Sequence, residues 1–210
     1  MGMLKVVVLI SGRGSNLKAI IDKCSKKNVS AKVIAIISNN SNASGLKLSG
    51  KFKKIIIDNK LSKKKFQIEL QNNLKKLKPD LICLAGFMKI LSPFITKKCK
   101  NKIINIHPSL LPSFKGLNTH KRALKAGAKK SGCTIHFVDE SLDGGPIIAQ
   151  VETTINKKMT STDLSKKILK MEHKIYPEVV NLFAMKKISM KENKVLIKDK
   201  KKLNLFIKNI

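Results

Sequence analysis

The stretch VVVLISGRGSNL, residues 6–17, decides which class of fold to expect. Its first part, residues 6–10, is an unbroken run of Val, Leu and Ile, typical of a strand buried on both faces of a parallel sheet. Gly12 and Gly14 break this run, and Ser15 is placed to cap a helix that we expect to continue to about Lys26. A buried strand, a glycine loop and a helix in this order predict the first unit of an α/β sheet.

Short apolar runs and amphipathic segments continue to alternate outward from this unit. We expect strands at residues 33–37, 55–57, 81–85 and 103–106, and a lysine-rich helix over 61–77. After residue 118 the order changes to a short helix at 119–126, strands at 133–138 and 147–151, and a long helix over 160–183. Ser161 or Thr162 is placed to cap that long helix. The pattern predicts an open, mostly parallel α/β sheet flanked by helices, with an antiparallel C-terminal part.

Length and composition indicate one domain with a short appendage. The chain has 210 residues, of which 42% are hydrophobic and 27% are charged, close to ordinary globular values. We divide it into a domain over 1–185 and a lysine-rich C-terminal extension over 186–210, which holds two weak β runs at 188–190 and 195–197. Neither a membrane-length apolar run nor a signal peptide is evident, and the four cysteines form no C-x-x-C pair. We therefore expect a soluble, cytoplasmic protein, either a monomer or a homodimer.

The charge is strongly positive, but its makeup argues against a nucleic-acid site. Lys and Arg total 44 against 13 Asp and Glu, which gives a net charge of +31. Only Arg13 and Arg122 are arginines, the residue best suited to phosphates and base edges. Aromatic residues make up 4% of the chain, so platforms for stacking bases are scarce. We interpret the charge as a solvated lysine surface that attracts anionic ligands.

The glycine loop is a candidate anion site, because backbone N–H groups at a helix start favour negative charge. A dinucleotide fold needs a third glycine where Leu17 stands, and an acidic residue where Ser38, Asn39 and Asn40 follow the second strand. The loop is therefore typical of a mononucleotide or sugar-phosphate site rather than of NAD binding. A plain tight turn capped by Ser15 is the structural alternative.

A histidine, an asparagine and an aspartate are the candidate catalytic groups. Asn105 and His107 lie two residues apart, so they share one side of a strand, and Pro108 places them at its end. Ligands of open α/β sheets bind at that end of the strands. Asp143 lies in a flexible turn and can raise the pKa of a nearby imidazole. These groups suit stabilising and protonating a tetrahedral intermediate, although a hydrogen-bonded structural pair remains an alternative for the strand.

The other three histidines carry weaker signals. His136 lies in an alternating strand pattern, where a satisfied core histidine and a supporting role in the site are equally compatible. His120 is a weak candidate, and His173 lies within a helical pattern, which favours a structural role. The spacing of these residues does not form a metal-ligand set, so we expect no metal.

Four motifs together resemble the folate-dependent formyltransferases. They are residues 11–17, the segment LAGFMKIL at 84–91, the segment NIHPSLLP at 105–112 and the segment LDGGPII at 142–148. The resemblance extends from about residue 4 to 185, and the combination is more specific than any single motif. It implies a Rossmann-like fold and the transfer of a formyl group from 10-formyltetrahydrofolate to the amine of glycinamide ribonucleotide, in purine synthesis.

The resemblance also implies roles for particular residues. The ribonucleotide substrate is expected at Gly14, Ser15, Asn16 and Glu172. The folate co-substrate is expected at Lys63, Met88, Lys89, Ile90, Leu91 and Asn105. Asn105 and His107 are expected to face the formyl carbon, with Asp143 tuning His107. Lys63 departs from the arginine that the family commonly has for the folate tail, because lysine keeps the charge but loses the bidentate fork.

Three rival interpretations explain less of the sequence. A methionyl-tRNA formyltransferase shares the same three polar residues but normally carries a further β-barrel, for which residues 186–210 are too few. A deformylase relative needs an additional N-terminal domain, whereas the first strand here starts near residue 4. A non-catalytic anion-binding or RNA-binding module leaves Asn105, His107 and Asp143 unexplained.

Overall fold

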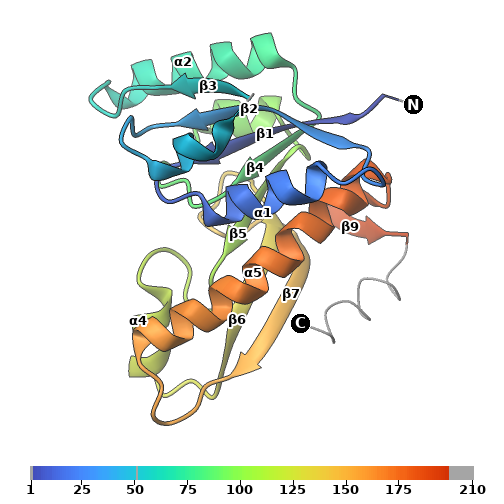
Figure 1. Ribbon diagram of the computed structural model, residues 1–210. Coiled ribbons are helices and arrows are strands. Elements are labelled where there is room, and N and C mark those ends of the chain that lie inside the picture. The colour runs from blue at the N-terminus through green and yellow to red at the C-terminus, as the bar shows by residue number, and fades with distance from the viewer. Residues whose placement is uncertain (1, 51, 199–210) are drawn as a thin grey trace.

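The chain folds around one twisted sheet whose first five strands are parallel. The computed structural model describes residues 2–50 and 52–198, and within them the large sheet has seven strands in the order β3-β2-β1-β4-β5-β6-β7 (Figure 1). β6 and β7 run antiparallel to their neighbours. The strands are β1 (Leu4–Ile10), β2 (Ala31–Ser38), β3 (Lys53–Ile56), β4 (Leu81–Leu84), β5 (Ile103–His107), β6 (Lys130–Phe137) and β7 (Ile147–Thr154). The predicted α/β class and the antiparallel C-terminal part are confirmed.

Helices cover both faces of this sheet. One apolar cluster joins the sheet to α1 (Ser15–Cys24) and α5 (Ser161–Ala184). A second cluster joins the opposite face to α2 (Lys63–Leu77) and α3 (Pro93–Lys98). The short α4 (Thr119–Lys125) contacts α5, and a 3-10 helix, η1 (Ser44–Ser49), follows β2. Because both faces are covered, β4 is buried along its whole length and β1 is buried from Val6 to Ile10, as their continuous apolar runs predicted.

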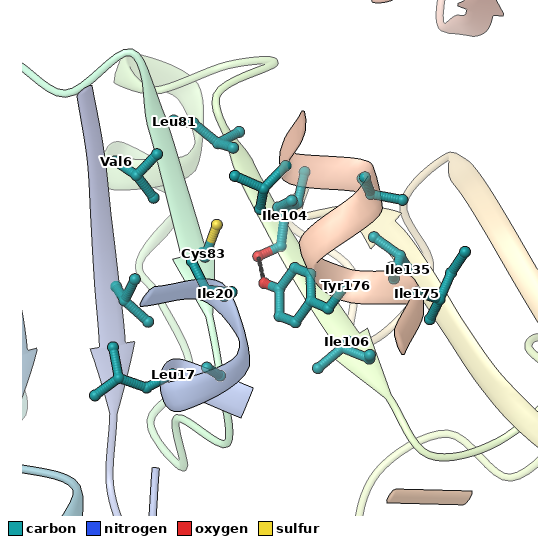
Figure 2. Close-up of a cluster of buried hydrophobic side chains, with 14 of the residues drawn as sticks. Val6, Leu17, Ile20, Leu81, Cys83, Ile104, Ile106, Ile135, Ile175 and Tyr176 are labelled. Carbon is teal, nitrogen blue, oxygen red and sulfur yellow. Dashed lines mark hydrogen bonds between the residues drawn. The ribbon is translucent and has the colours of Figure 1, made fainter. Parts of the chain in front are cut away.

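Tyr176 of α5 anchors the longest helix to the centre of the sheet. Its ring is fully buried among side chains of β1, β4, β5 and α1 (Figure 2). Its hydroxyl donates to two backbone carbonyls at 3.1 Å each, those of Leu84 in β4 and Ile104 in β5. A buried hydroxyl without such partners costs about 1–3 kcal/mol, so these bonds fix where α5 crosses the sheet. That crossing places Glu172, one helical turn earlier, beside α1.

Two predicted helix caps are wrong. α1 begins at Ser15 but is capped by Gly14, whose φ of 73° is left-handed, and it ends at Cys24 rather than near Lys26. A Cβ on Gly14 would lie 2.7 Å from the Gly45 Cα, so the close approach of two loops, which is invisible in the sequence, selects glycine here.

The long helix is likewise capped by Thr160 rather than by Ser161 or Thr162. The Thr160 hydroxyl accepts from the Asp163 N–H, and the Asp163 carboxylate accepts from the Thr160 N–H, which forms a capping box. These two residues, three positions apart, therefore satisfy two backbone N–H donors at the start of the helix. Thr160 therefore precedes the first helical residue instead of belonging to the helix, and the cap lies one residue before Ser161 and two before Thr162.

The sequence analysis also missed α3 and η1. Both are six residues long, too short to show an amphipathic period. α3 nevertheless carries a local signal, since Ser92 caps it and Pro93 occupies its first turn. α3 lies between β4 and β5 in the chain, and it packs on the same face of the sheet as α2.

A two-stranded hairpin, β8 (Ile188–Lys191) and β9 (Lys194–Ile197), follows α5 and matches the two predicted β runs. Ile188 is buried against the main core, and Val195 and Ile197 pack at its margin. We propose that the hairpin is an appendage resting on the domain over 1–185. The rest of the predicted extension, residues 199–210, lies outside the described residues.

The described residues also bear on cysteine chemistry and membrane association. All four cysteines are free thiols, and burial raises the pKa of the Cys24 thiol to about 11. Cys83 and Cys133 are buried in the core, as small apolar residues are. Among the helices that the structure describes, none is long and apolar enough to cross a membrane.

Candidate active site

A cleft of about 570 Å³ opens at the carboxyl ends of β4 and β5. Four segments line most of it: residues 86–91 after β4, residues 105–108 at the end of β5, and the loops 116–119 and 138–143. Asn16 of α1 and Glu172 of α5 close the remaining side. Strand ends of a parallel sheet converge on such a crevice, so the topology brings distant segments of the chain together here.

His107 and Asp143 face each other in this cleft. The Nδ1 atom of His107 lies 3.3 Å from the Oδ2 atom of Asp143, and both side chains are largely buried. The other ring nitrogen, Nε2, lies 3.0 Å from the carbonyl oxygen of Phe114. Both ring nitrogens therefore face acceptors, an arrangement that only the doubly protonated imidazolium satisfies at once. Both ring nitrogens of His107 are thus placed to donate hydrogen bonds.

The turn after Asp143 explains how this carboxylate reaches the histidine. A Cβ on Gly145 would collide with the carbonyl oxygen of Phe137 in β6, and one on Gly144 would collide with the Ser141 hydroxyl. Because Gly144 and Gly145 have no side chains, the turn can pack directly on the sheet. Asp143 itself has a φ of 48°, which aspartate tolerates better than most residues, and its Oδ2 accepts from the Gly116 N–H at 2.9 Å.

His136 orients Asn105, which lies opposite it on the neighbouring strand. The Asn105 Nδ2 atom lies 3.3 Å from His136 Nε2, and His136 Nδ1 lies 2.8 Å from the Phe137 carbonyl oxygen. These distances fit a neutral His136 that donates to the carbonyl and accepts from the amide. Burial lowers the pKa of His136, which favours that neutral form. Of the two interpretations of His136 left open above, the geometry favours the supporting role.

Asn16 and Glu172 form a buried pair across the cleft from α1 to α5. The Asn16 Nδ2 group donates to Glu172 Oε2 at 2.6 Å, and both residues are less than a tenth exposed. Burial raises the pKa of Glu172 to about 7, and the hydrogen bond from Asn16 opposes that shift. The Asn16 Oδ1 atom is buried and has no partner among the described residues. An acceptor without a partner at a cleft wall is placed to receive a hydrogen bond from a ligand.

Two polar side chains hold the segment 86–91 in place. The Ser11 hydroxyl accepts from the Met88 N–H at 2.8 Å and donates to Asn39. The Gln67 side chain donates to the Ile90 carbonyl at 2.9 Å and accepts from the Ser92 N–H at 2.9 Å. The side chains of Met88 and Ile90 are 64% and 66% exposed, so this wall of the cleft presents unusual apolar surface.

Some predicted site residues lie beside the cleft instead of lining it. Gly14 and Ser15 precede Asn16 in the first turn of α1 but are not lining residues. Lys63 is exposed in the first turn of α2, one helical turn before Gln67. His120 and His173 also lie outside the lining, and each has one buried ring nitrogen without a partner among the described residues. Residues 2–50 and 52–198 contain no group of three or more potential metal ligands.

Comparison with known proteins places this constellation in a family. The sequence matches the family described as "Formyl transferase" over residues 4–180. The chain belongs to that family. It is 39% identical over 194 residues to the phosphoribosylglycinamide formyltransferase of Escherichia coli (strain K12), covering 90% of this chain and 92% of the relative.

Solved structures of formyl transferase relatives agree over nearly the whole chain. The glycinamide ribonucleotide transformylase 1 of Symbiobacterium toebii is 38% identical with a TM-score of 0.88, and the match covers 93% of this chain and 94% of that one. The phosphoribosylglycinamide formyltransferase of Anaplasma phagocytophilum is 42% identical with a TM-score of 0.86, covering 92% and 93%. The fold expected from the resemblance is therefore shown.

Within this member of the formyl transferase family, the sequence analysis missed the loop that faces His107. The Phe114 carbonyl and the Gly116 N–H are backbone groups, which any residue type supplies, so no side-chain pattern marks them. In the structure, Phe114, Gly116 and Asn118 all have positive φ, so the backbone of this loop is strained where it passes the site. Its single glycine is too weak a sequence signature to predict that path.

Proposed function

We propose that this protein is a cytoplasmic enzyme of purine synthesis that transfers a formyl group from 10-formyltetrahydrofolate to the amine of glycinamide ribonucleotide. One observation carries the proposal: the facing His107 and Asp143 side chains, the Asn105 amide and the Asn16–Glu172 pair all line one cleft. The full-length relative from Escherichia coli (strain K12) is a phosphoribosylglycinamide formyltransferase, which supports this choice of acceptor.

The residues of the cleft fit both substrates. For the folate, the segment from Met88 to Leu91 offers exposed apolar side chains and backbone groups, which suit a flat heterocycle. Lys63 and Lys89 supply positive charge for its carboxylate tail. For the ribonucleotide, Gly14, Ser15 and Asn16 form the helix start that favours a phosphate, and Glu172 can accept from ribose hydroxyls. When bound, 10-formyltetrahydrofolate supplies an electrophilic formyl carbon and a nitrogen leaving group.

The three polar groups then divide the proton and charge transfers. As the amine nitrogen bonds to the formyl carbon, the carbonyl oxygen gains charge, and His107 Nε2 and the Asn105 amide donate hydrogen bonds to it. A well-placed donor of this kind contributes about 3–4 kcal/mol to transition-state stabilisation. The incoming oxygen displaces the Phe114 carbonyl from His107 Nε2. Asp143 keeps the imidazole charged. The amine loses a proton, and His107 assists the delivery of a proton to the leaving folate nitrogen as the bond between that nitrogen and the formyl carbon breaks.

An acceptor assay tests the proposal. Formyl transfer is followed by absorbance with a 10-formyl folate and glycinamide ribonucleotide, in parallel with methionyl-tRNA as the competing acceptor. We expect rapid transfer to glycinamide ribonucleotide and none to the tRNA. Transfer to methionyl-tRNA alone, or to neither acceptor, would overturn the proposal.

A further inference from the structure

A second cleft, of about 650 Å³, lies at the opposite end of the sheet from the candidate active site. It opens at the amino ends of β1, β4 and β5, where Lys5, Ile82 and Lys102 lie, and residues of α3 and of the end of α2 form its walls. Its volume is within the range of about 300–1,000 Å³ that small-molecule sites occupy. The function proposed above makes no use of this cleft.

The floor of this amino-end cleft is apolar and its wall carries an aromatic ring. Leu74 of α2, Ile82 of β4 and Ile95 of α3 form the floor and belong to the core. The ring of Phe94 is 50% exposed, and the Lys98 ammonium lies 5.8 Å from its centre. A half-exposed phenylalanine beside a cation offers a flat ligand both an apolar face and a charge.

Lysines dominate the rim. Of the thirteen lining residues, five are lysines, namely Lys5, Lys75, Lys78, Lys98 and Lys102. The single acidic lining residue, Asp80, accepts from the backbone N–H of Lys5 at 2.8 Å. Within residues 2–50 and 52–198, no carboxylate lies within 4 Å of any of these five ammonium groups. The rim is thus a concave surface with uncompensated positive charge, which concentrates anions.

Ordinary helix energetics explain only part of this arrangement. Lys75 and Lys98 lie in the last turns of α2 and α3, where a cation favours the helix dipole. Lys5 in β1 and Lys102 before β5 have no such reason to face the cleft. Lys78 caps α2 with a φ of 46°, a left-handed conformation in which glycine or asparagine is usual. A long basic side chain therefore occupies a position where local backbone energetics favour a small residue.

We propose that the amino-end cleft binds a small polyanion that carries an aromatic ring, namely a nucleoside triphosphate. The lysines of the rim would hold the phosphates as point charges, and Phe94 would pack against the base. A polynucleotide fits less well, because the charge surrounds a cleft of limited volume with one exposed ring instead of following a continuous stripe.

Titration calorimetry with ATP at 0.15 M NaCl tests the site. We expect binding with a Kd below about 1 mM. The double variant Lys5→Gln/Lys102→Gln should weaken binding by about tenfold or more, as loss of charge-assisted bonds predicts. The matched control Lys53→Gln/Lys54→Gln removes the same charge from exposed positions of β3 that do not line the cleft, and should change affinity less than about twofold. Lys78→Gly removes a third ammonium at a backbone conformation that glycine adopts freely, so it should weaken binding without unfolding the protein.

Further arms separate the parts of the ligand and the two clefts. Phe94→Ala should weaken binding of ATP but not of inorganic triphosphate, and adenosine alone should bind much more weakly than ATP. Asn16→Ala, in the candidate active site, should leave ATP affinity unchanged whether or not formyl transfer is detected. Equal losses in both lysine double variants, no binding of ATP, or a loss in Asn16→Ala matching that of the cleft variants would overturn the proposal.

Discussion

The two clefts of this protein have opposite charge although one sheet builds both. At the carboxyl ends of the strands, four acidic residues and a single lysine, Lys89, line the candidate active site. At the amino ends, five lysines and one acidic residue line the other cleft. The chain has only 13 acidic residues among 210, so the 24 lining residues of this cleft would contain about 1.5 of them on average, and they contain four. Asp143 faces His107 and Glu172 accepts from Asn16, whereas the lining of the amino-end cleft has Asp80 alone as an acidic residue.

The largest effect that would sharpen this contrast is expected from Asp143→Asn. Asparagine keeps the size of the side chain and can still accept from Gly116, but it removes the negative charge beside His107. We expect turnover to fall by roughly 10²–10⁴-fold with little change in substrate binding. Steady-state kinetics with glycinamide ribonucleotide and a 10-formyl folate measure both. Turnover close to that of the unaltered protein would remove the proposed role of the pair.

Gly145→Ala should unfold or misplace the turn that brings Asp143 to the site. Its Cβ would collide with the Phe137 carbonyl oxygen, and we expect a loss of about 3 kcal/mol in the free energy of unfolding. Gly12→Ala is the control, since no atom lies within 4 Å of a Cβ there, and it should cost less than about 1 kcal/mol. Urea denaturation measures both. Equal stability of the two variants would show that the turn is not packed as described.

Glu172 should make stability depend on pH, because burial raises its folded pKa to about 7 from an ordinary value of 4.5. Below pH 4.5 Glu172 is protonated in both the folded and the unfolded state, so its burial does not lower the free energy of unfolding through ionisation. As pH rises towards 7 the unfolded chain loses its proton first, so the free energy of unfolding falls and the full cost is present above pH 7. We expect Glu172→Gln to be more stable than the parent by about 2–3 kcal/mol at pH 8 and nearly equal at pH 4.

Urea denaturation of the parent protein and of Glu172→Gln, at pH 4 and at pH 8, measures this difference in stability. Glutamine still accepts a hydrogen bond from Asn16, so the packing of α1 on α5 is kept. A stability difference that is the same at both pH values would show that the ionisation of Glu172 is not its cause.

The smallest effect concerns the lysines of the amino-end cleft. Removing two neighbouring like charges by Lys5→Gln/Lys102→Gln should relieve repulsion and raise the Tm by about 1–2 °C at low ionic strength. The gain should vanish in 1 M NaCl, where charges more than about 3 Å apart are screened. Calorimetric scans at both salt concentrations check this. A gain that persists in high salt would point to packing instead of charge.

The sequence predicted the strands far better than it predicted the helix starts and the short helices between them. β4 and residues 6–10 of β1 are continuous apolar runs because both of their faces are covered, so their burial can be inferred from residue type. Helix starts were less certain. Gly14 caps α1 because Gly45 approaches it, and that contact joins two loops about thirty residues apart. The helix α3 was missed because six residues show no period.

For the candidate site, the sequence alone determined the chemical groups: Asn105 and His107 on one side of a strand that Pro108 ends, and Asp143 in a turn with two glycines. Periodicity and turn chemistry are local properties, so they can be inferred from neighbouring residues. Only the tertiary structure decided that the Phe114 carbonyl faces His107, that Asn16 bonds Glu172 across 156 positions, and that lysines from four segments surround one cleft. Those contacts depend on how the sheet twists and how α5 crosses it, which is set by the packing of the whole core.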